Sequence, residues 1–203
     1  MDKLIDDLIK LAFAEDIGDG DHTTLCCIPE TAMGKSQLII KEDGVLAGVE
    51  MAKRIFHDFD PELKMTVFIQ DGAEVKKGDI AFVVEGKIQS LLQTERLMLN
   101  VMQRMSGIAT TTRKYAKALE GTKTHVLDTR KTTPGMRMIE KEAVRIGGGM
   151  NHRIGLFDMI LLKDNHVDFA GGIEQAITRA QNYLKEKGTV SYTHLTLPTK
   201  LEV

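Results

Sequence analysis

The stretch Thr124-His-Val-Leu-Asp-Thr-Arg-Lys-Thr-Thr-Pro-Gly135 marks the point at which the chain changes to strands that alternate with helices. Its first residues predict a short strand over 124–127, which runs into a loop that carries Arg130 and Lys131. The elements expected after it are a helix over 136–146 that Gly147-Gly-Gly149 stops, an apolar strand over 159–162 and a helix over 173–187. This alternation is typical of a parallel α/β barrel, whose functional residues lie at the carboxyl ends of the strands.

The preceding part of the chain has a different pattern. Strands broken by glycine turns are predicted between residues 65 and 92, and a long helix is predicted over 90–119. The residues expected on the inner face of that helix are Leu91, Met98, Met102, Met105 and Ala109. Gly107 is expected to interrupt it and to mark a domain junction. We therefore predict an α/β protein: an α+β N-terminal sandwich domain over 1–108 and a partial parallel α/β barrel over 109–190.

The first residues predict a helix without a targeting signal. Its apolar positions within residues 3–14 have helical spacing and are Leu4, Leu8, Leu11 and Ala12. Gly18 is expected to end this helix, and a polar loop over 18–24 follows. The N-terminus lacks a long apolar run, so we expect no signal peptide and no membrane span. Cys26 and Cys27 are adjacent, which would strain a disulfide, and a reduced cytoplasmic protein is expected.

Cations are concentrated between residues 128 and 166, although the formal net charge of the whole chain is −2. They are Arg130, Lys131, Arg137, Lys141, Arg145, His152, Arg153, Lys163 and His166. Positive charge focused at strand ends of a near-neutral protein predicts a site for a small polyanion. A general nucleic-acid surface would need a basic excess over the whole domain. Residues 151–153 are expected in a loop or short extended segment that folds over the site.

Two chemistries are available to these cations. Arg130 and Arg153 can each hold a carboxylate in a bidentate fork, whereas Lys131 and Lys163 are suited to phosphate as point charges. His152 is expected to form hydrogen bonds beside the anion, because no Cys/His spacing supports a zinc site. The mixture fits a binder of a dicarboxylate and a phosphorylated sugar.

The alternative is that the cations are solvated and pair with nearby carboxylates. We expect this for Lys141 and Arg145, which share a helix face. Their partners would be Glu140, Glu142 and Asp158. Arg96 and Arg104 on the long helix are expected at the surface on composition alone. Gly147-Gly-Gly149 is weak evidence for a phosphate cradle.

A different class of function is indicated by the turns between residues 71 and 87. Asp71-Gly-Ala-Glu-Val-Lys-Lys-Gly-Asp79 and Glu85-Gly-Lys87 resemble turns of biotinyl and lipoyl carrier domains, in which a hairpin lysine carries the cofactor. Lys87 would be that lysine, but the flanking methionine or alanine pattern is missing. A non-catalytic, carrier-like binding module therefore stays as an alternative.

Over residues 3–188 the chain resembles the quinolinate phosphoribosyltransferases, also called carboxylating nicotinate-nucleotide pyrophosphorylases. The motifs that carry the resemblance are Gly18-Asp-Gly-Asp-His-Thr-Thr24, Glu95-Arg96, Leu99-Asn100, Gln103-Arg-Met-Ser-Gly-Ile-Ala-Thr110, Asp128-Thr-Arg-Lys-Thr-Thr-Pro-Gly135, Glu140-Lys141, Gly147-Gly-Gly149, Asn151-His-Arg153 and Lys163-Asp-Asn-His166. The resemblance implies a Mg²⁺-dependent pentosyltransferase of NAD biosynthesis. Its substrates would be quinolinate and phosphoribosyl pyrophosphate, and its products nicotinate mononucleotide, pyrophosphate and CO₂.

The resemblance also implies roles for individual residues. Arg130, Arg153 and Lys163 would hold the quinolinate carboxylates, with His152 nearby. Thr129 and Lys131 would line the same pocket, Lys131 facing the phosphoribosyl donor. Arg96 would reach into the site of a neighbouring subunit, so a homodimer or higher homo-oligomer is expected, without nucleic acid or membrane as partner.

The chain departs from this family pattern after Gly188. Residues 191–203, Ser-Tyr-Thr-His-Leu-Thr-Leu-Pro-Thr-Lys-Leu-Glu-Val, carry no helical or βα pattern and are interpreted as a non-native tail. The later barrel strands and their ribose- and magnesium-binding carboxylates would then be missing, and no metal ligand is expected in this chain. On this interpretation the chain as written is inactive. A related type II phosphoribosyltransferase of molybdenum-transport operons is the nearest alternative function.

Overall fold

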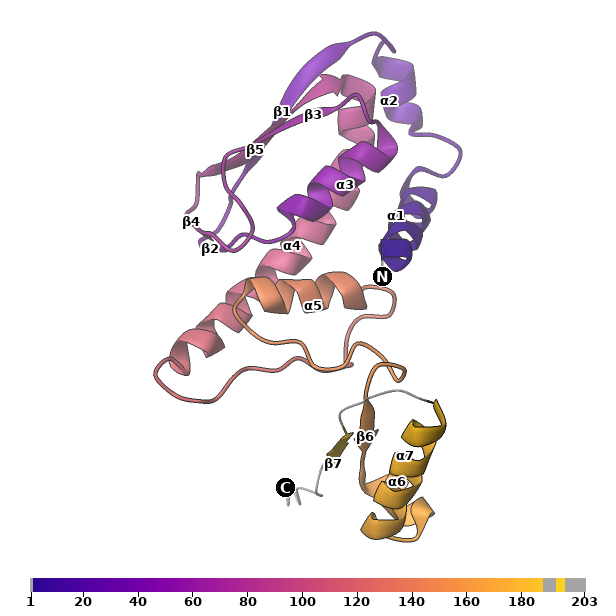
Figure 1. Cartoon of the computed structure of the whole chain (residues 1–203). Coiled ribbons are helices and arrows are strands. Elements are labelled where there is room, and N and C mark those ends of the chain that lie inside the picture. The colour runs from indigo at the N-terminus through magenta and orange to yellow at the C-terminus, as the bar shows by residue number, and fades with distance from the viewer. Residues whose placement is uncertain (1, 188–192, 196–203) are drawn as a thin grey trace, which may run out of the picture. The chain divides into compact units, whose positions relative to one another are not determined.

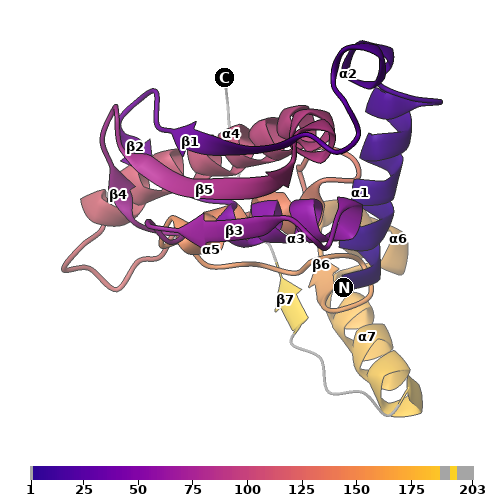
Figure 2. The same ribbon diagram turned by 90° about the horizontal axis from the view of Figure 1, so that it is seen from above.

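The computed structural model describes residues 2–187 and 193–195 (Figures 1 and 2). The chain divides into two compact units, of which the first ends at His152 and the second begins at Arg153. The domain boundary expected near residue 108 falls inside the helix α4 (Ile88–Ala118). The predicted α/β class is confirmed, since an antiparallel sheet comes first and helices then alternate with a parallel strand pair.

An antiparallel sheet forms one side of the first unit. Its strands lie in the order β1 (Met33–Ile39), β5 (Ile80–Lys87) and β3 (Lys64–Val67). A second, two-stranded sheet pairs β2 (Gly44–Val45) with β4 (Glu74–Val75). β5 lies in the middle of the larger sheet, and its apolar centre is buried. Consecutive residues of β5 are buried, so both of its faces are covered, and this accounts for its continuous apolar run.

Two helices pack with this sheet. α3 (Val49–Phe59) lies beside α4 (Figure 1), and Phe56 of α3 meets Phe82 of β5 edge to face at 6.3 Å. The inner face of α4 is the predicted one: Leu91, Met98, Met102, Met105 and Ala109 are all buried. A 3.6-residue period therefore identified the packing face correctly.

The break expected at Gly107 is wrong, because α4 runs through this residue without interruption. Glycine in a helix interior costs about 1 kcal/mol relative to alanine. Burial of Met105 and Ala109 on either side of it offsets such a cost. The helix consequently extends from the sheet to the region that the loops after residue 119 occupy.

The helix α1 (Asp2–Ile17) is oriented differently from the prediction. Leu4 and Leu11 are exposed, whereas Ile9 is buried. Ile5, Leu8 and Phe13 of the same helix are partly buried. The ring of Phe13 lies 5.0 Å from that of Phe59, so the helix is turned toward this aromatic contact. Gly18 follows the helix with φ +57°, in agreement with its predicted role.

The polar loop expected over 18–24 is partly helical. α2 (His22–Cys27) begins there because a carboxylate oxygen of Asp21 accepts a hydrogen bond from the Thr24 backbone N–H at 3.0 Å. This is a standard N-cap, and it satisfies one of the free donors of a helix start.

After α4 the chain forms α5 (Arg137–Ile146), which packs on α4 (Figure 1). The strand expected over 124–127 is reduced to one parallel bridge between Leu127 and Met150. Met150 N–H donates to Val126 O at 2.8 Å, and Asp128 N–H donates to Met150 O at 3.2 Å. Met150, directly before residues 151–153, therefore lies beside the start of the loop.

The second unit contains β6 (Ile160–Leu162), α6 (Asp164–Ala170) and α7 (Ile173–Lys187). The short strand β7 (Thr193–Leu195) pairs in parallel with β6, so β6, the helices and β7 form a βα unit. The tail was expected to carry no such pattern, and β7 corrects this for residues 193–195. Residues 191–192 and 196–203 of the expected tail lie outside the described residues.

Candidate anion-binding site

The loop over residues 128–135, called here the cationic loop, begins at a buried ion pair. Lys141 Nζ contacts Asp128 Oδ1 and donates to the backbone O of His152 at 3.0 Å. The same Asp128 oxygen accepts from His152 N–H at 2.8 Å. The Asn151 side-chain amide, with its nitrogen toward Asp128, adds a 2.8 Å bond to Oδ2. Asp128 thus ties the loop, α5 and residues 151–152 together.

The expectation of a solvated Lys141 is therefore wrong. Its side chain is 3% exposed and that of Asp128 is 6% exposed. A lysine is buried to this extent only when it is paired, because an isolated ammonium group is strongly destabilised away from water. Arg145 behaves as predicted, since its exposed guanidinium pairs with Glu142 on the same helix.

The other end of the cationic loop is held by a second charged pair. Arg104 of α4 donates from Nε at 3.0 Å and from a terminal nitrogen at 2.8 Å to Glu140 Oε1. Arg104 also donates to Thr133 Oγ1 at 3.2 Å, and Thr133 N–H donates to Glu140 Oε2 at 3.1 Å. Burial acts to raise the pKa of Glu140, but the hydrogen bonds from Thr133 and Arg104 outweigh it, so the pKa is lowered.

Arg104 is exposed, as composition predicted, and the structure shows that it also supports the loop. No local pattern in the sequence could have identified it, because its partner Glu140 lies 36 residues away. What the sequence does contain is a glutamate on the helix that follows a Thr-Thr-Pro-Gly turn. A buried glutamate needs a cation, and only the fold shows which one.

Between these two supports the loop presents its cations. Thr129 Oγ1 accepts a 3.0 Å bond from Lys131 N–H, and the Lys131 side chain is exposed. Arg130 is half-buried, and its Nε has no hydrogen-bond partner among the described residues. Because a buried guanidinium N–H normally has an acceptor, this donor is available to a ligand.

The second unit contains two of the predicted residues. Arg153 is buried, and one terminal nitrogen donates to Met159 O at 3.2 Å. Lys163 directly follows β6 and is exposed, as expected for a residue at a strand end. Its backbone N–H donates to His166 Nδ1 at 3.1 Å, so His166 caps α6. Asp158, expected to pair with a cation, accepts from Ile154 and Gly155 N–H at 2.7 and 2.8 Å.

The structure therefore brings some predicted site residues together. Thr129, Arg130, Lys131 and His152 belong to one unit, where Asp128 connects the cationic loop to His152. Arg153 and Lys163 belong to the other. Arg96 is exposed on α4, and no hydrogen bond joins it to the cationic loop among the residues described. It precedes Arg104 by about 12 Å along the helix axis.

The described residues do not suit a magnesium ion of their own. No group of three or more His, Cys, Asp or Glu residues that could hold a metal occurs in 2–187 and 193–195. Near the cationic loop, Asp128 and Glu140 are already engaged by Lys141 and Arg104. Mg²⁺ prefers several oxygen ligands, which this cationic surface does not supply. Within the same residues, no helix is long and apolar enough to cross a membrane.

The geometry does not favour the carrier alternative. A carrier lysine lies at a hairpin turn, whereas Lys87 ends β5 and directly precedes α4. Its ammonium group lies 3.5 Å from the Glu62 carboxylate.

Fold and site together define a class of α/β protein. An antiparallel sheet domain comes first, and a cationic region with βα elements, suited to small anionic ligands, follows it. The sequence matches the models of the quinolinate phosphoribosyl transferase N-terminal domain over residues 21–106 and C-terminal domain over residues 108–195. The chain belongs to the quinolinate phosphoribosyl transferase family.

Individual relatives agree with this assignment. A quinolinate phosphoribosyltransferase [decarboxylating] of Nicotiana glauca is 47% identical over 180 residues, which are 88% of this chain and 51% of that protein. A chloroplastic nicotinate-nucleotide pyrophosphorylase [carboxylating] of Arabidopsis thaliana is 48% identical over 89% of this chain and 51% of its own length. The crystal structure of NadC from Streptococcus pyogenes superposes with a TM-score of 0.89 at 39% identity, covering 98% of this chain and 70% of that one. The chain spans about half the length of the curated relatives it matches.

Proposed function

We propose that this chain is part of an enzyme that transfers the phosphoribosyl group of phosphoribosyl pyrophosphate to quinolinate. Membership of the family supports this proposal, and the observation that carries it is the cationic loop. In that loop a buried Arg130 Nε without an acceptor lies between two rigid supports. A planar carboxylate is the natural partner of such a guanidinium group.

In the proposed site Arg130, Arg153 and Lys163 bind the two carboxylates of quinolinate, with His152 beside them. Thr129 lines the pocket, and Lys131, exposed on the loop, faces the phosphates of the donor. This division follows the chemistry of the groups, because guanidinium forks match carboxylates and ammonium groups serve phosphates as point charges.

The reaction then follows from charge. The quinolinate ring nitrogen supplies the electron pair that forms the bond to C1 of the ribose, and the bond from C1 to pyrophosphate breaks. The ring becomes a cationic pyridinium, which accepts the electrons of the bond to the 2-carboxylate as CO₂ leaves. A proton replaces the carboxylate, and nicotinate mononucleotide results. Fixed cations around the substrate favour binding of the dianion and stabilise the departing pyrophosphate.

Three further features belong to the same proposal. Mg²⁺, which the family resemblance implies, would accompany the phosphoribosyl donor. Arg96, exposed on α4, completes the site of a second subunit in a homodimer or larger oligomer. A cytoplasmic location is consistent with the exposed, unbridged thiols of Cys26 and Cys27.

Titration calorimetry of the completed, full-length protein with quinolinate, nicotinate and nicotinamide tests the proposal, paired with an assay for pyrophosphate release from phosphoribosyl pyrophosphate. Quinolinate should bind most tightly, because it alone carries two carboxylates for the cations. Equal binding of nicotinate, or turnover of nicotinate without turnover of quinolinate, would contradict the proposed substrate. Such a result would leave room for the molybdenum-operon alternative, which the relatives do not favour.

A further inference from the structure

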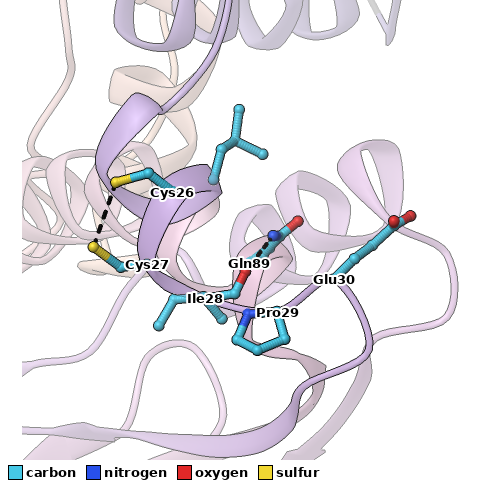
Figure 3. Close-up of a pocket in the computed structure, with 7 residues that line it drawn as sticks. Cys26, Cys27, Ile28, Pro29, Glu30 and Gln89 are labelled. Atoms are coloured by element: carbon cyan, nitrogen blue, oxygen red, sulfur yellow. Dashed lines mark hydrogen bonds between the residues drawn. The ribbon is translucent and has the colours of Figure 1, made fainter.

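Two thiols converge at a place well separated from the cationic loop. Cys26 and Cys27 are the last two residues of α2, both are exposed, and their Sγ atoms lie 3.4 Å apart (Figure 3). α2 is fastened near the start of α4, where the Gln89 side chain donates to Ile28 O at 2.7 Å. Arg104, which supports the cationic loop, follows Gln89 by roughly 22 Å along the helix axis. The thiols therefore form a site of their own.

The convergence is a specific property of this helix end. Adjacent residues of a regular helix do not face one another, because each step turns the side chain to another direction. Here the helix stops at Cys27, and Ile28 is extended with φ −110° and ψ 122°. Ile28 N–H donates to Thr24 O at 2.9 Å, and Ile28 O accepts from Gln89. The backbone that carries both sulfurs is thus fixed by contacts that do not involve them.

The thiols also border an open pocket of about 540 Å³. Its other lining residues are the apolar Leu25, Ile28 and Pro29 and the polar Glu30 and Gln89. A ligand that reaches both sulfur atoms therefore has room beside them for an organic group of moderate size, where burial of apolar area adds to binding.

The raised pKa of the Cys27 thiol disfavours reactions that need its thiolate. The hydrogen bond with Cys26 raises the pKa of the Cys27 thiol above its ordinary value of 9.0, so Cys27 is a neutral thiol at pH 7. Attack on an alkylating agent or a disulfide requires the thiolate, and it is slow under these conditions. Condensation of two thiols with one soft centre remains available.

We propose that Cys26 and Cys27 form a two-thiol site for a soft, trivalent centre that carries one organic group, of the organoarsenical class. With phenylarsine oxide as the probe, the two S–H bonds break and two As–S bonds form. The two released protons leave with the arsenical oxygen as one water molecule. Arsenic stays trivalent, so no oxidant or reductant is needed. Sulfur ligands select soft centres of this kind.

Chelation by two sulfurs makes the adduct persistent. Once the first As–S bond has formed, the second thiol is already 3.4 Å from the first, so the second bond closes within the molecule. Intramolecular closure of this kind strengthens binding by roughly 100-fold or more over a single contact. The phenyl ring would occupy the open pocket beside the sulfurs.

The experiment uses the whole chain, reduced with a phosphine, treated with one equivalent of phenylarsine oxide and analysed by intact mass. Cys26 and Cys27 are the only cysteines, so no other thiol competes. The variants are Cys26→Ser and Cys27→Ser, with circular dichroism to check that both stay folded. The wild type should gain one phenylarsenic group with loss of water and should keep it in excess glutathione. 2,3-Dimercaptopropanol should remove it.

Each single-serine variant should lose the group in glutathione roughly 100-fold faster than the wild type. Failure of the wild type to form the adduct, or equal persistence in either folded serine variant, would overturn the proposal. An adduct of two arsenicals per chain would also overturn it, because it shows that the thiols react separately.

Discussion

Lys141 and Asp128 form an ion pair in which both side chains are almost completely removed from water, with exposed fractions of 3% and 6%. The pair joins the helix that follows the cationic loop to the residue that opens it. His152 contributes its N–H to the carboxylate and its carbonyl oxygen to the ammonium group. Both charges are therefore also hydrogen-bonded to the backbone, which is the condition under which burial of an ion pair is tolerated.

Replacement of Lys141 by Met should destabilise the chain strongly. The methionine fills similar volume but leaves Asp128 as a buried carboxylate without a cation, which typically costs about 3–5 kcal/mol. Urea denaturation should therefore show a large fall in the free energy of unfolding. Asp128→Asn combined with Lys141→Met should recover part of the loss, because no lone charge remains buried.

The matched control is Arg145→Ala on the same helix. Its pair with Glu142 is exposed, so the expected change is at most about 1 kcal/mol. Equal losses for Lys141→Met and Arg145→Ala would show that the buried pair does not hold the loop.

Two glycines on or beside α4 should respond to alanine in opposite directions. A Cβ at Gly147 would lie 2.6 Å from Ala109 O and 2.6 Å from Thr112 Cβ. The backbone of α4 cannot move aside cheaply, so Gly147→Ala should destabilise by about 1–3 kcal/mol. A Cβ at Gly107 would meet no atom within 4 Å, and the residue is helical. Gly107→Ala should therefore stabilise by up to about 1 kcal/mol.

Thermal unfolding of both variants measures this contrast. A destabilised Gly107→Ala variant would show that the flexibility of this glycine is used in the fold. A neutral Gly147→Ala variant would argue that the glycine run does not serve the close approach of α5 to α4.

The spacing of apolar residues predicted the buried face of the long helix α4. It failed for side chains whose orientation depends on a partner elsewhere in the chain. The Met-rich face of α4 follows a 3.6-residue period and is buried as expected. The period does not reveal that Lys141 is on the buried side of α5, because its partner Asp128 lies 13 residues away. A charged residue can face inward wherever the fold supplies a buried charge of opposite sign. The spacing of apolar residues in the sequence does not indicate where this happens.

The same limit applies to the strand expected over 124–127. Its β-branched residues favour an extended backbone, but a ladder needs a neighbour of matching length, and only Met150 pairs with Leu127. α6 was missed for a different reason. It is only 7 residues long, and its start is capped by the side chain of His166. From the sequence alone, His166 is counted among the cations of the predicted anion site.

The stability of the chain should depend on Glu140 in a narrow acidic range. The folded-state pKa of Glu140 is lowered from the ordinary value of 4.5, because hydrogen bonds from Thr133 and Arg104 outweigh the effect of burial. A carboxyl whose pKa is lowered by folding contributes stability above its unfolded pKa and loses this contribution as the pH falls through the folded pKa. The loss should therefore begin near pH 4.5 and continue below it.

The measurement is the difference in unfolding free energy between the wild type and Glu140→Gln, followed from pH 6 down to acid in steps. Comparison of the two proteins removes the contributions of other carboxylates. The difference in unfolding free energy should shrink as the pH falls below about 4.5. A difference that does not change with pH would mean that Glu140 stabilises the loop without its charge.

Replacement of Arg130 by Ala should separate binding from folding. The Arg130 Nε is buried without an acceptor among the described residues, so removal of the side chain costs the unliganded chain no hydrogen bond at this atom. The free energy of unfolding should therefore not fall by more than about 0.5 kcal/mol. In the proposed complex this nitrogen faces a carboxylate of quinolinate. Loss of a buried bidentate partner typically costs about 3–5 kcal/mol of binding.

Calorimetry with quinolinate and with phosphoribosyl pyrophosphate distinguishes the two ligands. Quinolinate affinity should fall much more than donor affinity in Arg130→Ala, and Arg130→Lys should lie between Ala and the wild type, because lysine keeps the charge without the fork. Arg145→Ala serves as the control, since it removes an exposed arginine outside the loop. If folded Arg130→Ala binds quinolinate as the wild type does, the dicarboxylate pocket lies elsewhere. If both ligands weaken equally, Arg130 attracts anions through its charge alone.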